Sequence, residues 1–129
     1  PTTLETLKEI CYYAAFDYSK RVFPAWDTEI RYVFIDGNKE FRNAAPLIND
    51  GKWEEAIKIW KQYVKSKDKE LASRATYNLA IAYEILGEID LAIEWAQVSY
   101  DIKEKRRTKY YILKLKNRKI DFQKLKYQL

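Results

Sequence analysis

The chain has 129 residues, of which 47% are hydrophobic and 33% are charged, and it contains only three glycines and three prolines. This composition is typical of one well-packed, helix-rich domain, and it argues against a disordered chain. The single cysteine, Cys11, excludes a disulfide within the chain and a multi-cysteine metal site, and no apolar run reaches the roughly 18 residues of a transmembrane helix.

The first predicted element is an amphipathic helix over residues 4–22, where apolar side chains recur at steps of three and four residues. Pro24 supplies the stop. Cys11 lies on the apolar stripe of this helix, so we expect a buried thiol that behaves as a small hydrophobic side chain.

Residues 28–35 change to β-branched and aromatic side chains and run into a turn at residues 36–38. This pattern predicts a β-strand. Because the sequence offers no second strand, the backbone donors and acceptors of this strand would lack partners. We therefore expect either an extended strap on the helices or pairing with a sheet that lies outside this chain.

Every segment after Asn38, the expected N-cap, is predicted to be helical. Pro46 lies inside the first of these helices and costs about 3 kcal/mol unless the helix kinks or restarts there. Gly87 is expected to end the third helix, because glycine tolerates a left-handed cap. The five helices are expected at residues 39–50, 52–66, 70–86, 89–103 and 107–128, with a hydrophilic loop at residues 65–69.

A segment of the sequence is repeated after 36 residues. The positions of Gly51, Trp53 and Ala56 are taken in the second copy by Gly87, Ile89 and Ala92. A period in the thirties with two helices per unit is typical of a helical solenoid, in which each unit buries its apolar face against its neighbours.

The repeated pattern resembles the tetratricopeptide repeat (TPR), most closely over residues 74–103. The resemblance implies that Ala80 and Ala92 allow two helices to approach closely, that Gly87 makes the turn between them, and that Tyr83 fills the space beside the next helix. Ser99 holds a further position where the repeat has a small residue. The repeat-defining residues are Gly51, Trp53, Ala56, Ala80, Tyr83, Gly87 and Ala92.

The implied fold is all-α: a short TPR-like α-solenoid of two helix-turn-helix repeats, at about residues 38–68 and 70–104, with a C-terminal capping helix at about 107–128. One helix and a single extended strand precede it. The expected division is into residues 1–37, which hold this helix and strand, and residues 38–129, the helical domain.

A looser resemblance rests on Phe23-Pro24-Ala25-Trp26, on the strand with Arg31 and Tyr32, and on residues 37–41 leading into the repeats. This order is similar to the C-terminal half of an uncharacterised family of predicted envelope lipoproteins of Bacteroidetes. The resemblance implies a location on the periplasmic side of the cell envelope, with a lipid anchor in a segment before Pro1. It also implies that residues 1–37 are the last elements of an amino-terminal domain that is missing from this chain. It implies no activity.

The sequence predicts neither an enzyme nor a cofactor or metal site. It contains no histidine, which is the commonest general base and metal ligand near neutral pH. The carboxylate pairs, Glu54 with Glu55 and Glu88 with Asp90, stand at helix starts, where acidic side chains favour the helix dipole. We therefore name no catalytic residue.

The leading functional hypothesis is a non-catalytic protein-protein interaction or scaffold module with a protein or peptide partner. The resemblance to the repeat implies that the first helix of each unit lines an inner groove, which the final helix or the first helix of the chain would also be able to fill. Rings and aliphatic side chains with a few charges suit an extended or helical peptide. The groove residues are Phe41, Ala45, Ile48 and Asn49 in the first unit and Arg74, Tyr77, Ile81 and Glu84 in the second.

The alternative hypothesis uses the basic C-terminal segment, which carries 11 Lys or Arg and two acids over residues 103–129. Such a segment binds nucleic acid or an anionic membrane surface, or it is the solvated face of a capping helix. The interleaved apolar residues favour the capping helix, and we favour a protein partner over nucleic acid. Neutralising Lys114, Lys116, Arg118 and Lys119 separates the two hypotheses. Neither the oligomeric state nor the partner follows from the sequence.

Overall fold

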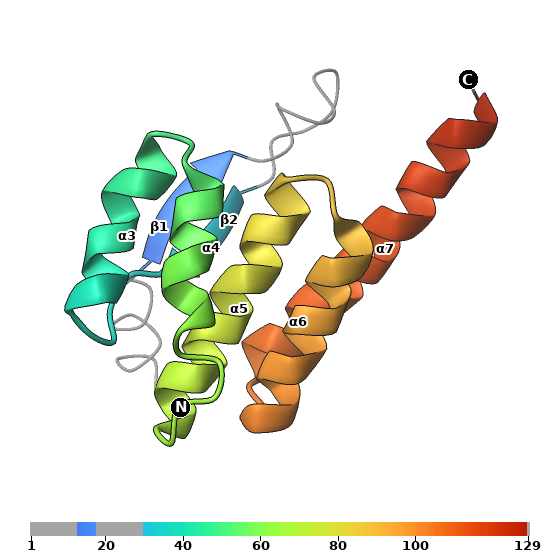
Figure 1. Ribbon diagram of the computed structural model, residues 1–129. Helices are drawn as coiled ribbons and strands as arrows, with labels where there is room; N and C mark the ends of the chain where they lie inside the picture. Colours follow the sequence, from blue (N-terminus) through green and yellow to red (C-terminus); the bar gives the residue numbers. More distant parts are fainter. Residues whose placement is uncertain (1–12, 18–29, 129) are drawn as a thin grey trace. The chain divides into compact units, whose positions relative to one another are not determined.

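The computed structural model describes residues 13–17 and 30–128, and this part of the chain is mostly helical, as predicted (Figure 1). The chain divides into two compact units between Ile59 and Trp60. Buried apolar side chains form a core in each, with Val33, Phe34 and Phe41 in the first unit and Leu79, Ile81 and Leu115 in the second. The elements are β1 (Tyr13–Asp17), β2 (Ile30–Phe34), α3 (Lys39–Asn49), α4 (Trp53–Lys61), α5 (Lys69–Ile85), α6 (Ile89–Ile102) and α7 (Arg106–Gln128).

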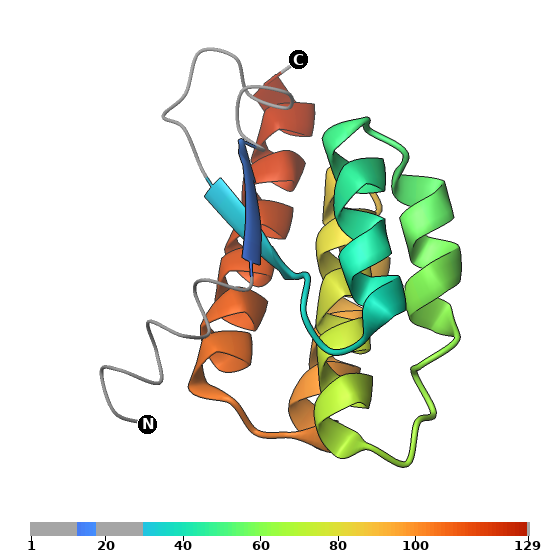
Figure 2. The ribbon, with the colours of Figure 1, turned by 90° about the vertical axis from the view of Figure 1, so that its left-hand side faces the viewer.

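The predicted strand is β2, and it has a partner within the chain. Strand β1 pairs with it antiparallel, with Tyr13 opposite Phe34 and Asp17 opposite Ile30 (Figure 2). The prediction of a single unpaired strand is therefore wrong, and so is the prediction of helix at residues 13–17. The rest of the predicted helix over residues 4–22, including Cys11, lies outside the described residues.

The physical reason for this error is the ambiguity of a short apolar segment. Ala14 and Ala15 satisfy a helical stripe together with apolar residues before and after them. The short apolar run at residues 13–16 fits a strand equally well. The backbone hydrogen bonds that β2 requires decide between the two, and that requirement is not local.

Helix α3 begins and ends as its sequence predicts. The Asn38 side chain accepts a hydrogen bond from the Phe41 backbone N–H at 3.0 Å, as an N-cap does. Pro46 lies within the helix. The helix ends with N–H groups of Gly51 and Lys52 bonded to the carbonyls of Ile48 and Leu47, at 3.0 and 2.8 Å. These two bonds make a Schellman motif.

Helix α5 ends with the same motif. The N–H groups of Gly87 and Glu88 donate to the carbonyls of Glu84 and Tyr83, at 3.1 and 2.8 Å. Gly51 and Gly87 both have positive φ, at 75° and 86°, a conformation that costs little for glycine alone. The two glycines therefore make the bends between consecutive helices, as predicted from the repeated segment.

Helix α4 is shorter than predicted and ends at Lys61. Beyond it, the N–H groups of Tyr63 and Ser66 donate to carbonyls three residues back, which are turn bonds rather than α-helical bonds. Helix α5 then starts at an N-cap, where the Asp68 carboxylate accepts from the N–H groups of Glu70 and Leu71.

Helices α5 and α6 pack closely through small side chains. Ala80 on α5 and Ala92 on α6 are fully buried. At the other end of this pair, the Ser99 hydroxyl donates to the Ser73 carbonyl at 2.8 Å, a contact that larger side chains would prevent. Helix α7 crosses α6 at an angle, and its last turns extend beyond α6 (Figure 1).

Candidate functional site

The second-unit residues predicted to line a groove share one face of α5. Arg74, Tyr77, Ile81 and Glu84 follow one another at steps of three, four and three residues, which places them on one side of a helix. Ile81 and Glu84 are fully buried, and Tyr77 is 6% exposed. This part of α5, which we call the α5 face, is therefore covered in the folded chain.

Helix α7 contacts the α5 face through long side chains. The rings of Tyr77 and Tyr111 lie 5.2 Å apart between centroids and are tilted by 48°, a favourable aromatic arrangement. The Tyr111 hydroxyl donates a hydrogen bond of 2.7 Å to Oε1 of Glu84. One tyrosine of α7 thus contacts two of the four predicted residues.

The Glu84 carboxylate is the polar centre of this contact. It lies at 0% exposure, and Nε of Arg118 lies 3.9 Å from its second oxygen, Oε2. The Arg118 side chain is itself only 8% exposed. Removing a charge from water is costly unless an opposite charge and a hydrogen bond accompany it, and here Arg118 and Tyr111 provide both.

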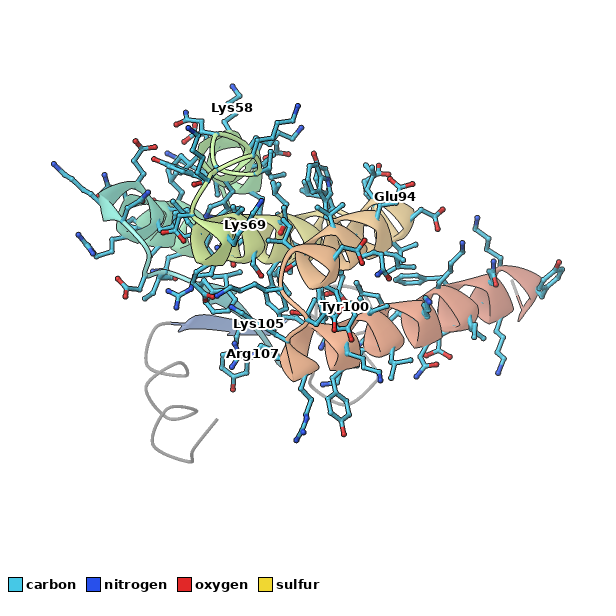
Figure 3. The ribbon with its side chains drawn as sticks, turned by 90° about the horizontal axis from the view of Figure 1, so that it is seen from below. Lys58, Lys69, Glu94, Tyr100, Lys105 and Arg107 are labelled. Atoms are coloured by element: carbon cyan, nitrogen blue, oxygen red, sulfur yellow. The ribbon has the colours of Figure 1, made fainter. Side chains whose placement is uncertain are left out.

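A second charged cluster fixes the segment between α6 and α7. The Glu70 carboxylate, in the first turn of α5, accepts from Arg74 at 2.9 Å, from Lys103 at 3.0 Å and from Lys105 at 2.6 Å. Figure 3 shows Lys105 close to the start of α7. The predicted groove residue Arg74 therefore shares the Glu70 carboxylate with Lys103 and Lys105, the two lysines of the segment that connects α6 to α7.

This cluster changes the acidity of Glu70. Partial burial would raise the pKa of its carboxyl group, but the hydrogen bonds from Lys105, Arg74 and Lys103 outweigh burial and lower the pKa to about 2. Glu70 is therefore ionised throughout the physiological pH range, and the cluster persists there.

The first-unit residues of the predicted groove lie on α3, and their environments differ. Phe41 and Ile48 are buried, at 0% and 7% exposure. Ala45 is half-buried and Asn49 is exposed. Two of the four thus contribute to the core, and two remain at the surface.

The sequence placed the four residues on one side of a helix but did not reveal the side chains of α7 that contact them. The available signal was the spacing of Tyr111, Leu115, Arg118 and Phe122 at steps of four, three and four, which marks one side of a helix. Arg118 was instead counted with the basic segment. Lys119, another residue of the basic segment, forms an ion pair within the chain. Its ammonium lies 2.8 Å from the Asp90 carboxylate on α6.

Among the described residues, no group of three or more Asp, Glu, Cys or His side chains is placed to hold a metal ion. None of the helices in the described part of the chain combines the length and the apolarity needed to cross a membrane.

Comparison with known proteins identifies the family. Residues 42–117 match the family described as Domain of unknown function (DUF6340). The match covers more than half of the chain, from α3 into α7, so the chain belongs to this family. No curated protein and no solved structure matches the chain.

Proposed function

We propose that this chain is a non-catalytic protein-protein interaction or scaffold module of TPR type. The support is a local unit that occurs twice in the chain. Each unit consists of a helix, a Schellman turn at a glycine and a second helix, and the two glycines stand 36 residues apart. A TPR-like α-solenoid is the arrangement that such units adopt when they stack, and the concave faces of such arrays are their usual binding surfaces.

The observation that carries the proposal is the way the α5 face holds an amphipathic helix. Tyr111 and Arg118 of α7 stand seven residues apart, or two helical turns, and both approach Glu84. A partner helix with an aromatic hydroxyl and a guanidinium at this spacing fits the same face, in the manner of a helix bound in a groove. In the isolated chain, α7 occupies the place of that partner.

The test is competition between α7 and a labelled peptide of residues 106–128. The full-length variant Tyr111→Ala/Arg118→Ala weakens the hold of its own α7, so we expect it to bind the wild-type peptide at least about tenfold more tightly than the unmodified chain does. Fluorescence anisotropy measures the affinity. Circular dichroism verifies that the variant keeps its helices.

Two further peptides make the test specific. A peptide with Tyr111→Ala and Arg118→Ala should not bind the full-length variant, whereas a peptide with Tyr110→Ala and Lys116→Ala should bind it as the wild-type peptide does, because these two residues are exposed. Equal binding of both altered peptides would contradict the proposal.

A location in the cell envelope is a separate proposal, supported only by the order of motifs around residues 23–41. It places a lipid anchor in a segment encoded before Pro1. Determining that upstream sequence tests it, since a segment without a lipidation cysteine would remove the anchor.

A further inference from the structure

Helix α7 carries a second apolar stripe, on the side away from Tyr111 and Arg118. The stripe consists of four residues at steps of three, seven and seven: Tyr110, Leu113, Ile120 and Tyr127. Side chains seven residues apart on a helix point in directions that differ by only about 20°. They are exposed to 63%, 52%, 48% and 93%. We call these four residues the outer stripe, which extends over about 25 Å of helix.

Lysines accompany the outer stripe along its length. Lys109 and Lys116 each precede a stripe residue by four positions, and Lys124 follows Ile120 by four, so all three lie on the same side of α7 as the stripe. All three are exposed. Residues 106–128 contain nine Lys or Arg and a single acid, Asp121, so α7 carries a strong positive charge.

We propose that the outer stripe docks α7 onto an anionic lipid bilayer, with the helix lying in the plane of the interface. A helix of this type buries its apolar side chains at the level of the headgroups, while the long side chains of its lysines extend to the lipid phosphates. Tyrosine suits this depth, because its ring is apolar and its hydroxyl is wet.

The charge and the size of the stripe decide against other occupants. A second copy would bring two strongly positive helices together, which is unfavourable. The four side chains expose a few hundred square ångströms, less than the roughly 800 Å² per partner of a standard protein interface. Nucleic acid would use the lysines but would gain nothing from the aliphatic side chains of Leu113 and Ile120, which form the middle of the stripe.

A bilayer requires neither a large complementary surface nor a pocket. Each lysine near an anionic surface adds about fivefold to the binding constant, and partial insertion of the apolar side chains adds to that. This inference does not rest on the proposed function, because the peptide-binding proposal uses the other side of α7.

Flotation of the full-length chain with lipid vesicles tests the inference. We expect binding to phosphatidylcholine vesicles that contain phosphatidylglycerol and none to phosphatidylcholine alone. Leu113→Ser/Ile120→Ser should lower the partition coefficient roughly tenfold or more, through the loss of inserted apolar surface. Lys109→Ala/Lys116→Ala/Lys124→Ala should lower it by about fivefold for each lysine removed.

The matched control is Leu91→Ser/Val98→Ser on α6. These residues are exposed to 38% and 40% and stand seven positions apart, as Leu113 and Ile120 do. The control should bind vesicles as the unmodified chain does, and circular dichroism should show the same helix content for all variants.

Three results would overturn the inference. The first is an absence of binding to anionic vesicles at low ionic strength. The second is binding, to vesicles or to a mixed-sequence nucleic acid, that depends on the lysines but is unchanged by Leu113→Ser/Ile120→Ser. The third is a dimer in sedimentation equilibrium that dissociates when Leu113 and Ile120 are replaced, which would make a second copy the occupant.

Discussion

Glu70 links the start of α5 to the segment between α6 and α7 through three cationic side chains. Its pKa falls from 4.5 to about 2 on folding, so the folded chain binds the proton less well than the unfolded chain. The stabilisation is therefore complete above about pH 5 and is lost as the pH falls toward 2.

The prediction for this residue is a difference in pH dependence between the unmodified chain and Glu70→Gln. Because the carboxylate is about one third exposed, solvent screening reduces its contribution to about 1–2 kcal/mol at neutral pH. Urea unfolding should show this difference at pH 7 and a progressively smaller one below pH 4. A difference that persists unchanged at pH 2.5 would show that the charge of Glu70 is not its cause.

At the scale of elements, the positions of α3 to α7 were predictable because their signals are local. Asn38 caps the helix that follows it, and each of the two glycines ends the helix before it. The apolar periodicity likewise belongs to the helix that it predicts. The strand at residues 13–17 was not predictable in this way, because its pairing partner lies beyond a connection of 12 residues. Long-range hydrogen bonding, rather than propensity, selects that conformation.

The glycine bends give a prediction at the same scale. A Cβ atom at Gly51 or at Gly87 would meet nothing within 4 Å, so substitution by alanine introduces backbone strain without a steric clash. We expect Gly51→Ala and Gly87→Ala each to lower the free energy of unfolding by about 1–2 kcal/mol. Lys58→Ala, at an exposed position on α4, should change it by less than about 0.5 kcal/mol.

Urea denaturation of the three variants measures these values. Equal costs at the two glycines would agree with their similar φ angles and identical turn bonds. A glycine whose replacement by alanine leaves stability unchanged would not occupy the left-handed conformation in solution.

For the molecule as a whole, the candidate site depends on a contact between segments that are distant in sequence. Periodicity alone was sufficient to place Tyr77, Ile81 and Glu84 on one face of α5. It did not reveal that Tyr111 and Arg118 would occupy this face, because their pairing with Glu84 joins positions 27 and 34 residues away. The same periodicity gave α7 two apolar sides, and only the packed structure shows which side faces α5.

The buried Glu84 carboxylate is the polar centre of the contact between α5 and α7, which gives the last prediction. Glu84→Ala removes the acceptor of the Tyr111 hydroxyl and the carboxylate beside the buried Arg118 guanidinium. Breaking a buried ion pair in this way lowers the free energy of unfolding by about 3–5 kcal/mol. Because whole domains are stable by only about 5–15 kcal/mol, we expect α7 to leave the α5 face in a substantial fraction of molecules. Hydrogen exchange should then accelerate across residues 106–128.

Glu94→Ala is the matched control for this variant, because Glu94 is an exposed glutamate on α6 (Figure 3). It should leave exchange in α7 unchanged. Released α7 would also enlarge the molecule, so small-angle scattering of Glu84→Ala should give a larger radius of gyration than that of Glu94→Ala. Unchanged exchange and radius in Glu84→Ala would mean that apolar packing alone holds α7, and the Tyr111 and Arg118 contacts would then lose their place in the proposed recognition of a partner helix.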